Sequence, residues 1–129
     1  MKSRLTKMLL IIALGSCNRE GGSAYEMKCK RDMGTIATMV DVYREENGRV
    51  DLRDQRLMAK LIDIGTYPLA NIFAERKIVI SNGMALDPLG TPYQIRYNDG
   101  IVTLWSWGKN GIDEDGGGDD IKIRVRQAD

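Results

Sequence analysis

A dense group of acidic residues near the C-terminus is the part of this chain best suited to chemistry. Residues 106–121 carry five carboxylates within eight positions, together with three consecutive glycines. The five are Asp113, Glu114, Asp115, Asp119 and Asp120. Clustered carboxylates repel one another, and a hard cation relieves that repulsion because Ca²⁺ takes about six to eight oxygen ligands. We expect a calcium-binding loop here, with a solvated turn rich in Asp and Gly as the alternative.

The spacing of these residues excludes two well-known calcium motifs. An EF-hand that began at Asp113 would place Gly117 and Arg124 at positions where oxygen ligands are needed. The sequence also contains no repeated glycine and aspartate array of the kind that binds calcium between β-solenoid turns. A metal ion in this segment would therefore occupy a single loop site.

Other candidate chemistry is sparse. The chain of 129 residues has no His, so a Cys29 nucleophile would have no imidazole to activate it, and core packing is the better use of this thiol. The formal net charge is +1 and the basic residues are not clustered, so we expect no nucleic-acid binding. We expect no enzymatic activity.

The first residues resemble the signal sequence of bacterial lipoproteins. Basic residues precede a short apolar run over residues 8–14, well below the ~20 residues that span a bilayer. Leu14, Gly15 and Ser16 then lead into Cys17, as in the lipobox whose cysteine carries the lipid. The alternative is an ordinary cleaved signal followed by an incidental cysteine.

The lipoprotein interpretation divides the chain into three parts. These are a signal peptide (residues 1–16), a lipidated Cys17 with a flexible tether (residues 17–24), and a globular domain (residues 25–129). Removal of the signal leaves a slightly acidic mature chain, because the only charged residues in the signal are basic. Asn18 follows the cysteine, so no Asp stands at this position to suggest retention at the inner membrane. We expect a cell-envelope protein anchored by lipid, at the outer membrane facing the periplasm if the cell has two membranes.

Residues 25–47 predict a long helix. Apolar residues recur there at three- and four-residue steps, charged residues such as Asp32 lie off this stripe, and Asn47 with Gly48 supplies a stop signal. The stripe consists of Cys29, Met33, Ile36, Val40 and Tyr43. A second, shorter helix is expected over residues 52–64.

The second half of the chain predicts β-structure. Alternating apolar and polar residues favour strands over residues 93–97, 101–106 and 121–126, and residues 78–80 favour a short strand. Residues 98–100 are typical of a hairpin turn. The expected architecture is α+β, with one long N-terminal helix packed on a small antiparallel sheet of three to four strands. The acidic segment precedes the last strand.

Two tryptophans lie at the entrance to the acidic segment. Trp105 and Trp107 are two positions apart, so they would share one side of an extended strand. They could form an exposed aromatic surface for a partner, or the acidic segment could fold over them. We favour the covered arrangement, because large indoles usually pack in protein interiors.

Residues 87–95, Asp-Pro-Leu-Gly-Thr-Pro-Tyr-Gln-Ile, closely resemble a segment of the major pseudopilins of type II secretion. In that family the segment leads into a hairpin and then into a loop of the form Ser-x-Gly-x-Asp-Gly that is closed by Asp-Ile. Residues 106–111 and 120–121 stand at the matching places. Residues 43–49 also resemble the family's helix end, whereas residues 51–85 show no resemblance.

The resemblance implies a pilin-like fold with a structural Ca²⁺ ion in the last loop. Asn110 stands where the family has a ligand aspartate, and Asp120 keeps its family position. Asp113, Asp115 and Asp119 are additional candidate ligands that could restore the charge missing at Asn110.

The N-terminus departs from the family pattern. Pseudopilins begin with about twenty apolar residues that form both the membrane span and the fibre core, whereas residues 19–23 here are charged, small or polar. The expected function is a structural or accessory part of a type II secretion or pilus-like machine, with its proteins as partners. The alternative is a surface recognition or adhesion module that contacts its partner through Trp105, Trp107 and the basic face of the last strand.

Overall fold

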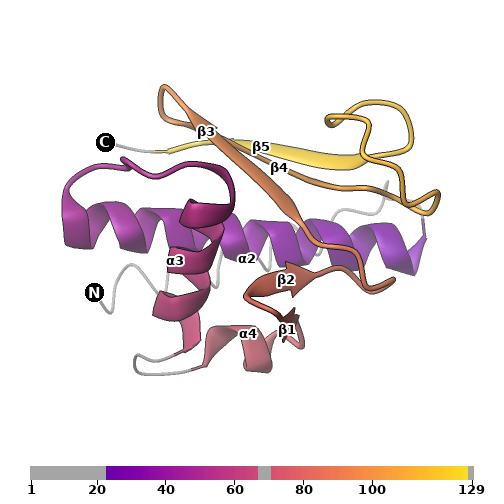
Figure 1. Cartoon of the computed structure of the whole chain (residues 1–129), viewed down its shortest axis with the longest axis horizontal. Coiled ribbons are helices and arrows are strands. Elements are labelled where there is room, and N and C mark those ends of the chain that lie inside the picture. The colour runs from indigo at the N-terminus through magenta and orange to yellow at the C-terminus, as the bar shows by residue number, and fades with distance from the viewer. Residues whose placement is uncertain (1–22, 67–70, 128–129) are drawn as a thin grey trace.

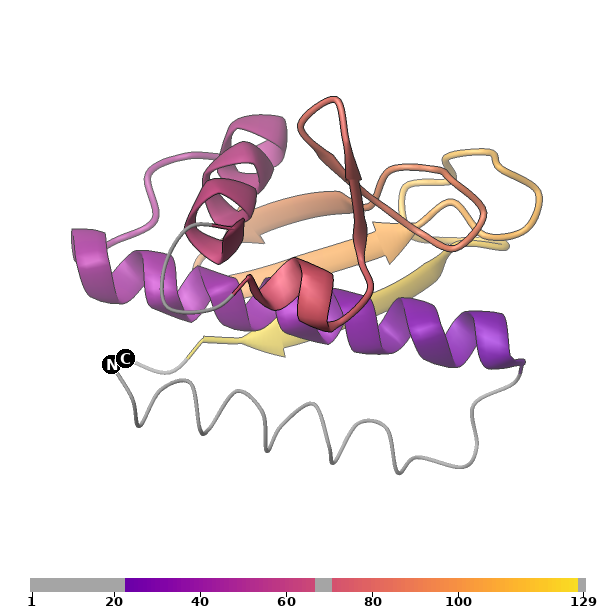
Figure 2. The same cartoon turned by 90° about the horizontal axis from the view of Figure 1, so that it is seen from below.

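The structure of this protein is a computed structural model that describes residues 23–66 and 71–127. A long helix runs beneath a three-stranded antiparallel sheet, and shorter elements pack beside both (Figures 1 and 2). The elements are α2 (Ala24–Asn47), α3 (Asp54–Thr66), α4 (Ile72–Glu75), β1 (Val79–Ser81), β2 (Met84–Leu86), β3 (Gln94–Asn98), β4 (Ile101–Ser106) and β5 (Ile121–Arg126). The predicted α+β, pilin-like architecture is confirmed.

Both ends of α2 are capped, although only the C-terminal stop was predicted. The Ser23 side chain accepts a hydrogen bond from the backbone N–H of Glu26, and Gly48 ends the helix in the left-handed conformation at φ 79°. The predicted stripe forms the core face, since Cys29, Met33 and Ile36 are all fully buried. The apolar spacing therefore correctly identified both the helix and the side it buries.

The sheet has the strand order β3-β4-β5. Asp99 and Gly100 both have positive φ, at 51° and 78°, as the two central residues of a tight hairpin turn require. The inner face packs on α2, with Val102 and Leu104 fully buried. The three predicted strands are confirmed to within one residue of their observed bounds.

The middle of the chain was predicted less well. Helix α3 begins and ends two residues later than expected, and strand β1 is shifted by one residue. Helix α4 and strand β2 were missed, because elements of four and three residues are too short to show a period. Strand β2 pairs with β1 around the turn at Asn82 and Gly83, which forms a separate two-stranded sheet.

A buried charge fastens α2 to the rest of the domain. Asp32, which lies off the predicted apolar stripe, is only 3% exposed. Its carboxylate accepts a 2.8 Å hydrogen bond from the Tyr93 hydroxyl and a 2.6 Å bond from the Lys28 ammonium. Burial raises the pKa of Asp32, although the bonds from Lys28 and Tyr93 oppose the shift. Lys28 also donates to the carbonyls of Arg76 and Lys77, so the cluster joins α2, the residues after α4 and the residue before β3.

The proposed signal peptide and the lipidated Cys17 lie outside the described residues. Of the predicted tether, Ser23 and Ala24 are described, and they form the cap and first residue of α2. Among the described residues, no helix has the length and hydropathy to cross a bilayer.

Candidate functional site

The turn that precedes β3 is organised around one carboxylate. The backbone N–H of Gly90 donates to the carbonyl of Asp87, and Pro88 stands at the second position of this turn, where its fixed φ is favoured. Asp87 Oδ1 accepts hydrogen bonds of 2.9 Å from the backbone N–H groups of Leu89 and Thr91. In the Asp-Pro-x-Gly-Thr sequence, the side chain of the first residue thus accepts hydrogen bonds from the backbone of the turn that follows it.

The other oxygen of Asp87 reaches across the fold. Asp87 Oδ2 accepts hydrogen bonds from the hydroxyls of Tyr25 at 2.9 Å, Thr91 at 2.8 Å and Ser106 at 2.8 Å. Burial alone would raise the pKa of Asp87, but its hydrogen bonds from Thr91, Ser106 and Tyr25 outweigh burial and hold the pKa below its usual value. This ionised carboxylate joins the first turn of α2, the turn before β3 and the end of β4.

Ser106 carries this connection into the acidic loop, defined here as residues 107–120. Its hydroxyl oxygen is fully buried and accepts a 3.1 Å hydrogen bond from the backbone N–H of Gly108. Gly108 has φ 75°, and a Cβ there would overlap the backbone carbonyl oxygen of Asp119. The beginning and end of the acidic loop meet at this glycine, which no bulkier residue could replace without displacement.

Inside the acidic loop, the carboxylates accept hydrogen bonds from the loop's own backbone. Asp120 Oδ2 bonds the N–H groups of Glu114 and Gly116, each at 2.9 Å. Asp119 Oδ2 bonds the N–H of Asn110 at 3.0 Å, and the Glu114 side chain bonds the N–H of Asp119 at 2.7 Å. These bonds partly offset the repulsion among the carboxylates and give the loop a defined shape.

The acidic loop also covers Trp105. The indole N–H donates a 3.0 Å hydrogen bond to Asp113 Oδ1, and the Arg96 guanidinium lies 5.0 Å from the ring centroid. Trp105 is 5% exposed, which agrees with the covered arrangement and leaves little of its ring for a partner. Trp107 lies just beyond β4 and is half-buried, and its indole nitrogen has no hydrogen-bond partner within the described residues.

The backbone N–H of Asp115 and the Trp105 indole lower the pKa of Asp113, because both donate to its carboxylate. Asp115 itself forms an exposed 2.6 Å ion pair with Arg96. Both side chains therefore already have partners that any metal ion would have to share.

Calcium chemistry can be tested against this arrangement. One buried oxygen, Asp120 Oδ1, has no hydrogen-bond partner within the described residues, and buried carboxylate oxygens normally require one. In the same loop, the Asp119 carboxylate accepts a hydrogen bond from the backbone N–H of Asn110. The donor types fit a hard cation, but across residues 23–66 and 71–127 no three Asp, Glu, His or Cys side chains are gathered to hold a metal. An ion would have to draw these oxygens together.

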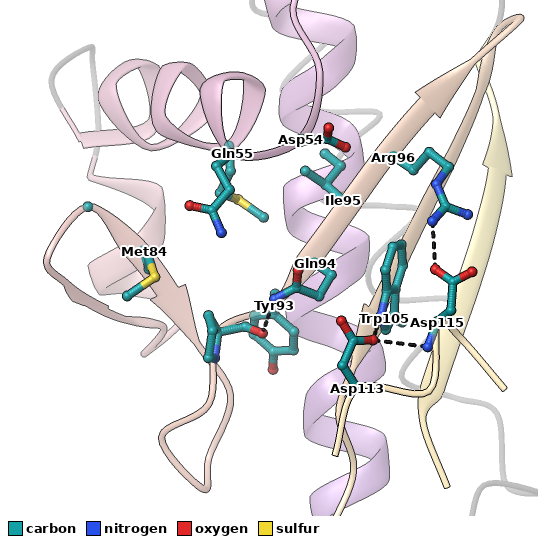
Figure 3. A pocket seen from close by; sticks show the side chains of 13 residues that line it. Asp54, Gln55, Met84, Tyr93, Gln94, Ile95, Arg96, Trp105, Asp113 and Asp115 are labelled. Carbon is teal, nitrogen blue, oxygen red and sulfur yellow. Dashed lines mark hydrogen bonds and ion pairs between the residues drawn. The ribbon is translucent and has the colours of Figure 1, made fainter. Parts of the chain in front are cut away.

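A pocket of about 330 Å³ lies beside the acidic loop (Figure 3). Met84 of β2 and Gln55 of α3 stand on one side of it, and Trp105, Asp113 and Asp115 stand on the other. No pair of groups in it resembles a nucleophile with its base. The buried Cys29 thiol offers none either, since burial raises its pKa.

The sequence could have indicated part of this site and not the rest. The Asp-Pro-x-Gly motif marked the Asp87 turn, but nothing in the pattern pointed to Tyr25, which is 62 positions away and completes the Asp87 cluster. The pairing of Arg96 with both Asp115 and Trp105 was also missed, because it depends on how the acidic loop folds back on β3.

Comparison with known protein families gives a match over most of the chain. Residues 16–126 match the family model for type II secretion system (T2SS), protein G. The matched range includes residues 51–85, where no motif resemblance was found. No curated protein and no solved structure shows a significant match to the chain.

Proposed function

Because the chain belongs to the type II secretion system protein G family, we propose that it is a non-enzymatic, structural or accessory component of a type II secretion or pilus-like machine in the cell envelope. The family match over residues 16–126 is the observation that carries this proposal. The buried side chains fit it, since the polar interior around Asp87 holds the turn and the acidic loop in place. Secretion in cells that lack the gene tests the proposal, because a structural role requires export to fall.

We further propose that lipid on Cys17 anchors the domain. The support is the Leu-Gly-Ser-Cys sequence at residues 14–17. Only five residues separate Cys17 from Ser23, and a fully extended chain of this length spans ~20 Å. The N-terminal end of α2, and with it the acidic loop, would then lie close to the membrane surface.

Fatty-acid labelling in cells tests the anchor. Wild-type protein should incorporate a labelled fatty acid and fractionate with membranes, and Cys17→Ala should do neither. The matched control is Cys29→Ala, which removes the buried thiol and should leave labelling unchanged. Equal labelling of wild type and Cys17→Ala would refute the anchor.

The third part of the proposal is a structural Ca²⁺ ion in the acidic loop. Asp119, Asp120 and Asn110 are the most suitable ligands, because Asp120 has a buried oxygen without a hydrogen-bond partner among the described residues and Asp119 is already hydrogen-bonded to Asn110. Asp113 and Asp115 would contribute if the ion displaced their present hydrogen bonds. Calcium would neutralise the loop and reinforce the closure at Gly108, but it would take no part in a reaction.

Thermal unfolding with calcium and with chelator tests this part. With an affinity like that of extracellular calcium modules, millimolar calcium should stabilise the protein by about 1–2 kcal/mol. Asp120→Ala should abolish this increment, while Asp63→Ala, on the exposed side of α3, should retain it. The readout is the calcium-dependent increment, because Asp120→Ala also removes two loop hydrogen bonds and lowers the baseline. Equal midpoints with and without calcium in the wild type would exclude the ion.

A further inference from the structure

Among the described residues, no strand pairs with the outer edge of β5. The backbone N–H of Gln127 donates a 2.7 Å hydrogen bond to the carbonyl of Gly100, which fixes the pairing of β5 with β4. Bonded residues alternate along an antiparallel strand, so every second residue of β5 directs its N–H and C=O away from the sheet. β5 ends the strand order β3-β4-β5, and Figure 2 shows it at the border of the sheet. The outward residues are Lys122, Arg124 and Arg126.

The same residues form a row of cations. Their side chains are exposed on the outer face of the sheet, and none of them has an ion pair within the described residues. Arg96 differs, because it lies on the same face but is bound by Asp115 and stacked on Trp105. Successive cations stand about 6.7 Å apart along the strand, the distance between alternate residues.

We propose that the edge of β5 binds an extended acidic segment of a partner protein, which adds to the sheet as a fourth strand. The partner backbone would pair with the outward N–H and C=O groups of Lys122, Arg124 and Arg126. Carboxylates at alternate positions of that segment would face the three cations, since both strands repeat every two residues. This proposal goes beyond the structural role and depends on neither the lipid nor the calcium.

Two other occupants fit less well. A second copy of β5, paired antiparallel, would place two rows of like charge directly opposite each other, which is destabilising. An anionic membrane could neutralise the side chains, but it offers no donors and acceptors in register with the strand. Edge strands also carry Lys or Arg simply to prevent aggregation, and in that case no ligand would bind.

A labelled peptide that alternates Glu and Val over eight residues is a suitable probe. Its binding to the purified full-length protein in detergent can be followed by fluorescence anisotropy at low and high salt. We expect binding that weakens with salt, and at least about tenfold weaker binding by the triple variant K122E/R124E/R126E. The matched control R53E/R56E/K60E makes the same charge change at exposed positions on α3 and directly before it, and should bind like wild type.

Two further probes separate strand addition from simple charge attraction. A peptide with alternate backbone nitrogens methylated keeps its carboxylates but loses its edge donors, so it should not bind. Vesicles containing phosphatidylglycerol report on a membrane instead. Equal binding of the methylated peptide, unchanged binding by the β5 triple variant, or binding of vesicles but not of the peptide would each overturn the proposal.

Discussion

At the scale of single residues, Asp87 connects three parts of the domain that meet beside the acidic loop. Its five hydrogen bonds come from a turn, a helix and a strand that are distant in sequence. Loss of one partner in such a cluster leaves the remaining buried groups unsatisfied. The charge of Asp87 is therefore worth more to stability than an exposed carboxylate would be.

We predict that Asp87→Asn lowers the free energy of unfolding by about 2–4 kcal/mol at pH 7, because an amide cannot accept at both atoms. The folded-state pKa of Asp87 is lowered, so its stabilisation is present above the unfolded value of about 3.9 and is lost as the pH falls through the folded value. The difference between wild type and variant should narrow below about pH 4. Urea denaturation from pH 7 to pH 3 measures it.

Asp63→Ala serves as the control, since an exposed side chain away from the cluster should change stability by less than about 0.5 kcal/mol. The raised pKa of Asp32 makes a contribution to the free energy of unfolding that is lost as the pH rises, opposite to that of Asp87. Wild type and variant share this contribution, so it cancels in their difference. A difference that stays constant with pH would show that the Asp87 charge is not the cause.

Gly108 gives a second prediction at this scale. Gly108→Ala combines a left-handed φ of 75° with overlap on Asp119, whereas Gly111→Ala has a similar φ of 68° and open space around it. We expect Gly111→Ala to cost about 1 kcal/mol and Gly108→Ala to cost clearly more and expose the acidic loop to proteases. Equal losses would mean that the closure at Gly108 does not hold the loop.

At the scale of elements, the sequence predicted those parts whose pattern repeats. Helix α2 has its buried stripe at every expected position, and β3, β4 and β5 alternate regularly enough to be bounded within one residue. Helix α4 and strand β2 have too few residues for any period. The burial of Asp32 could not be predicted, because the groups that allow it, Lys28 and the Tyr93 hydroxyl, meet Asp32 only in the fold.

The acidic loop could also be predicted in part only. Its composition and its place after β4 indicated an acidic loop closed by Asp120, and the structure places Asp119 and Asp120 at its closing end. The individual hydrogen bonds could not be predicted, because they depend on positive φ values at Gly108, Asp115 and Gly116. Spacing alone does not show that Asp115 turns outward to Arg96, nor that Asp120 Oδ1 is buried with no hydrogen-bond partner in the described part of the chain.

At the scale of the whole molecule, the acidic loop and the basic row of β5 occupy different parts of the surface. The acidic loop joins the N-terminal end of α2 through Tyr25, Asp87 and Ser106, whereas the basic row of β5 runs away from that loop along the sheet border (Figure 1). With a lipid on Cys17, the loop would face the membrane and the far end of β5 would remain available to other proteins. This arrangement suits a tethered domain that binds neighbours in a secretion machine.

The most direct test of the central claim is secretion by cells that lack the gene. Export of type II substrates into the medium should fall in the deletion strain and be restored by wild-type protein. Restoration should be weak with Cys17→Ala and complete with Cys29→Ala, at equal protein levels. Normal export in the deletion strain, in a host with a single copy of the gene, would contradict a structural role in secretion.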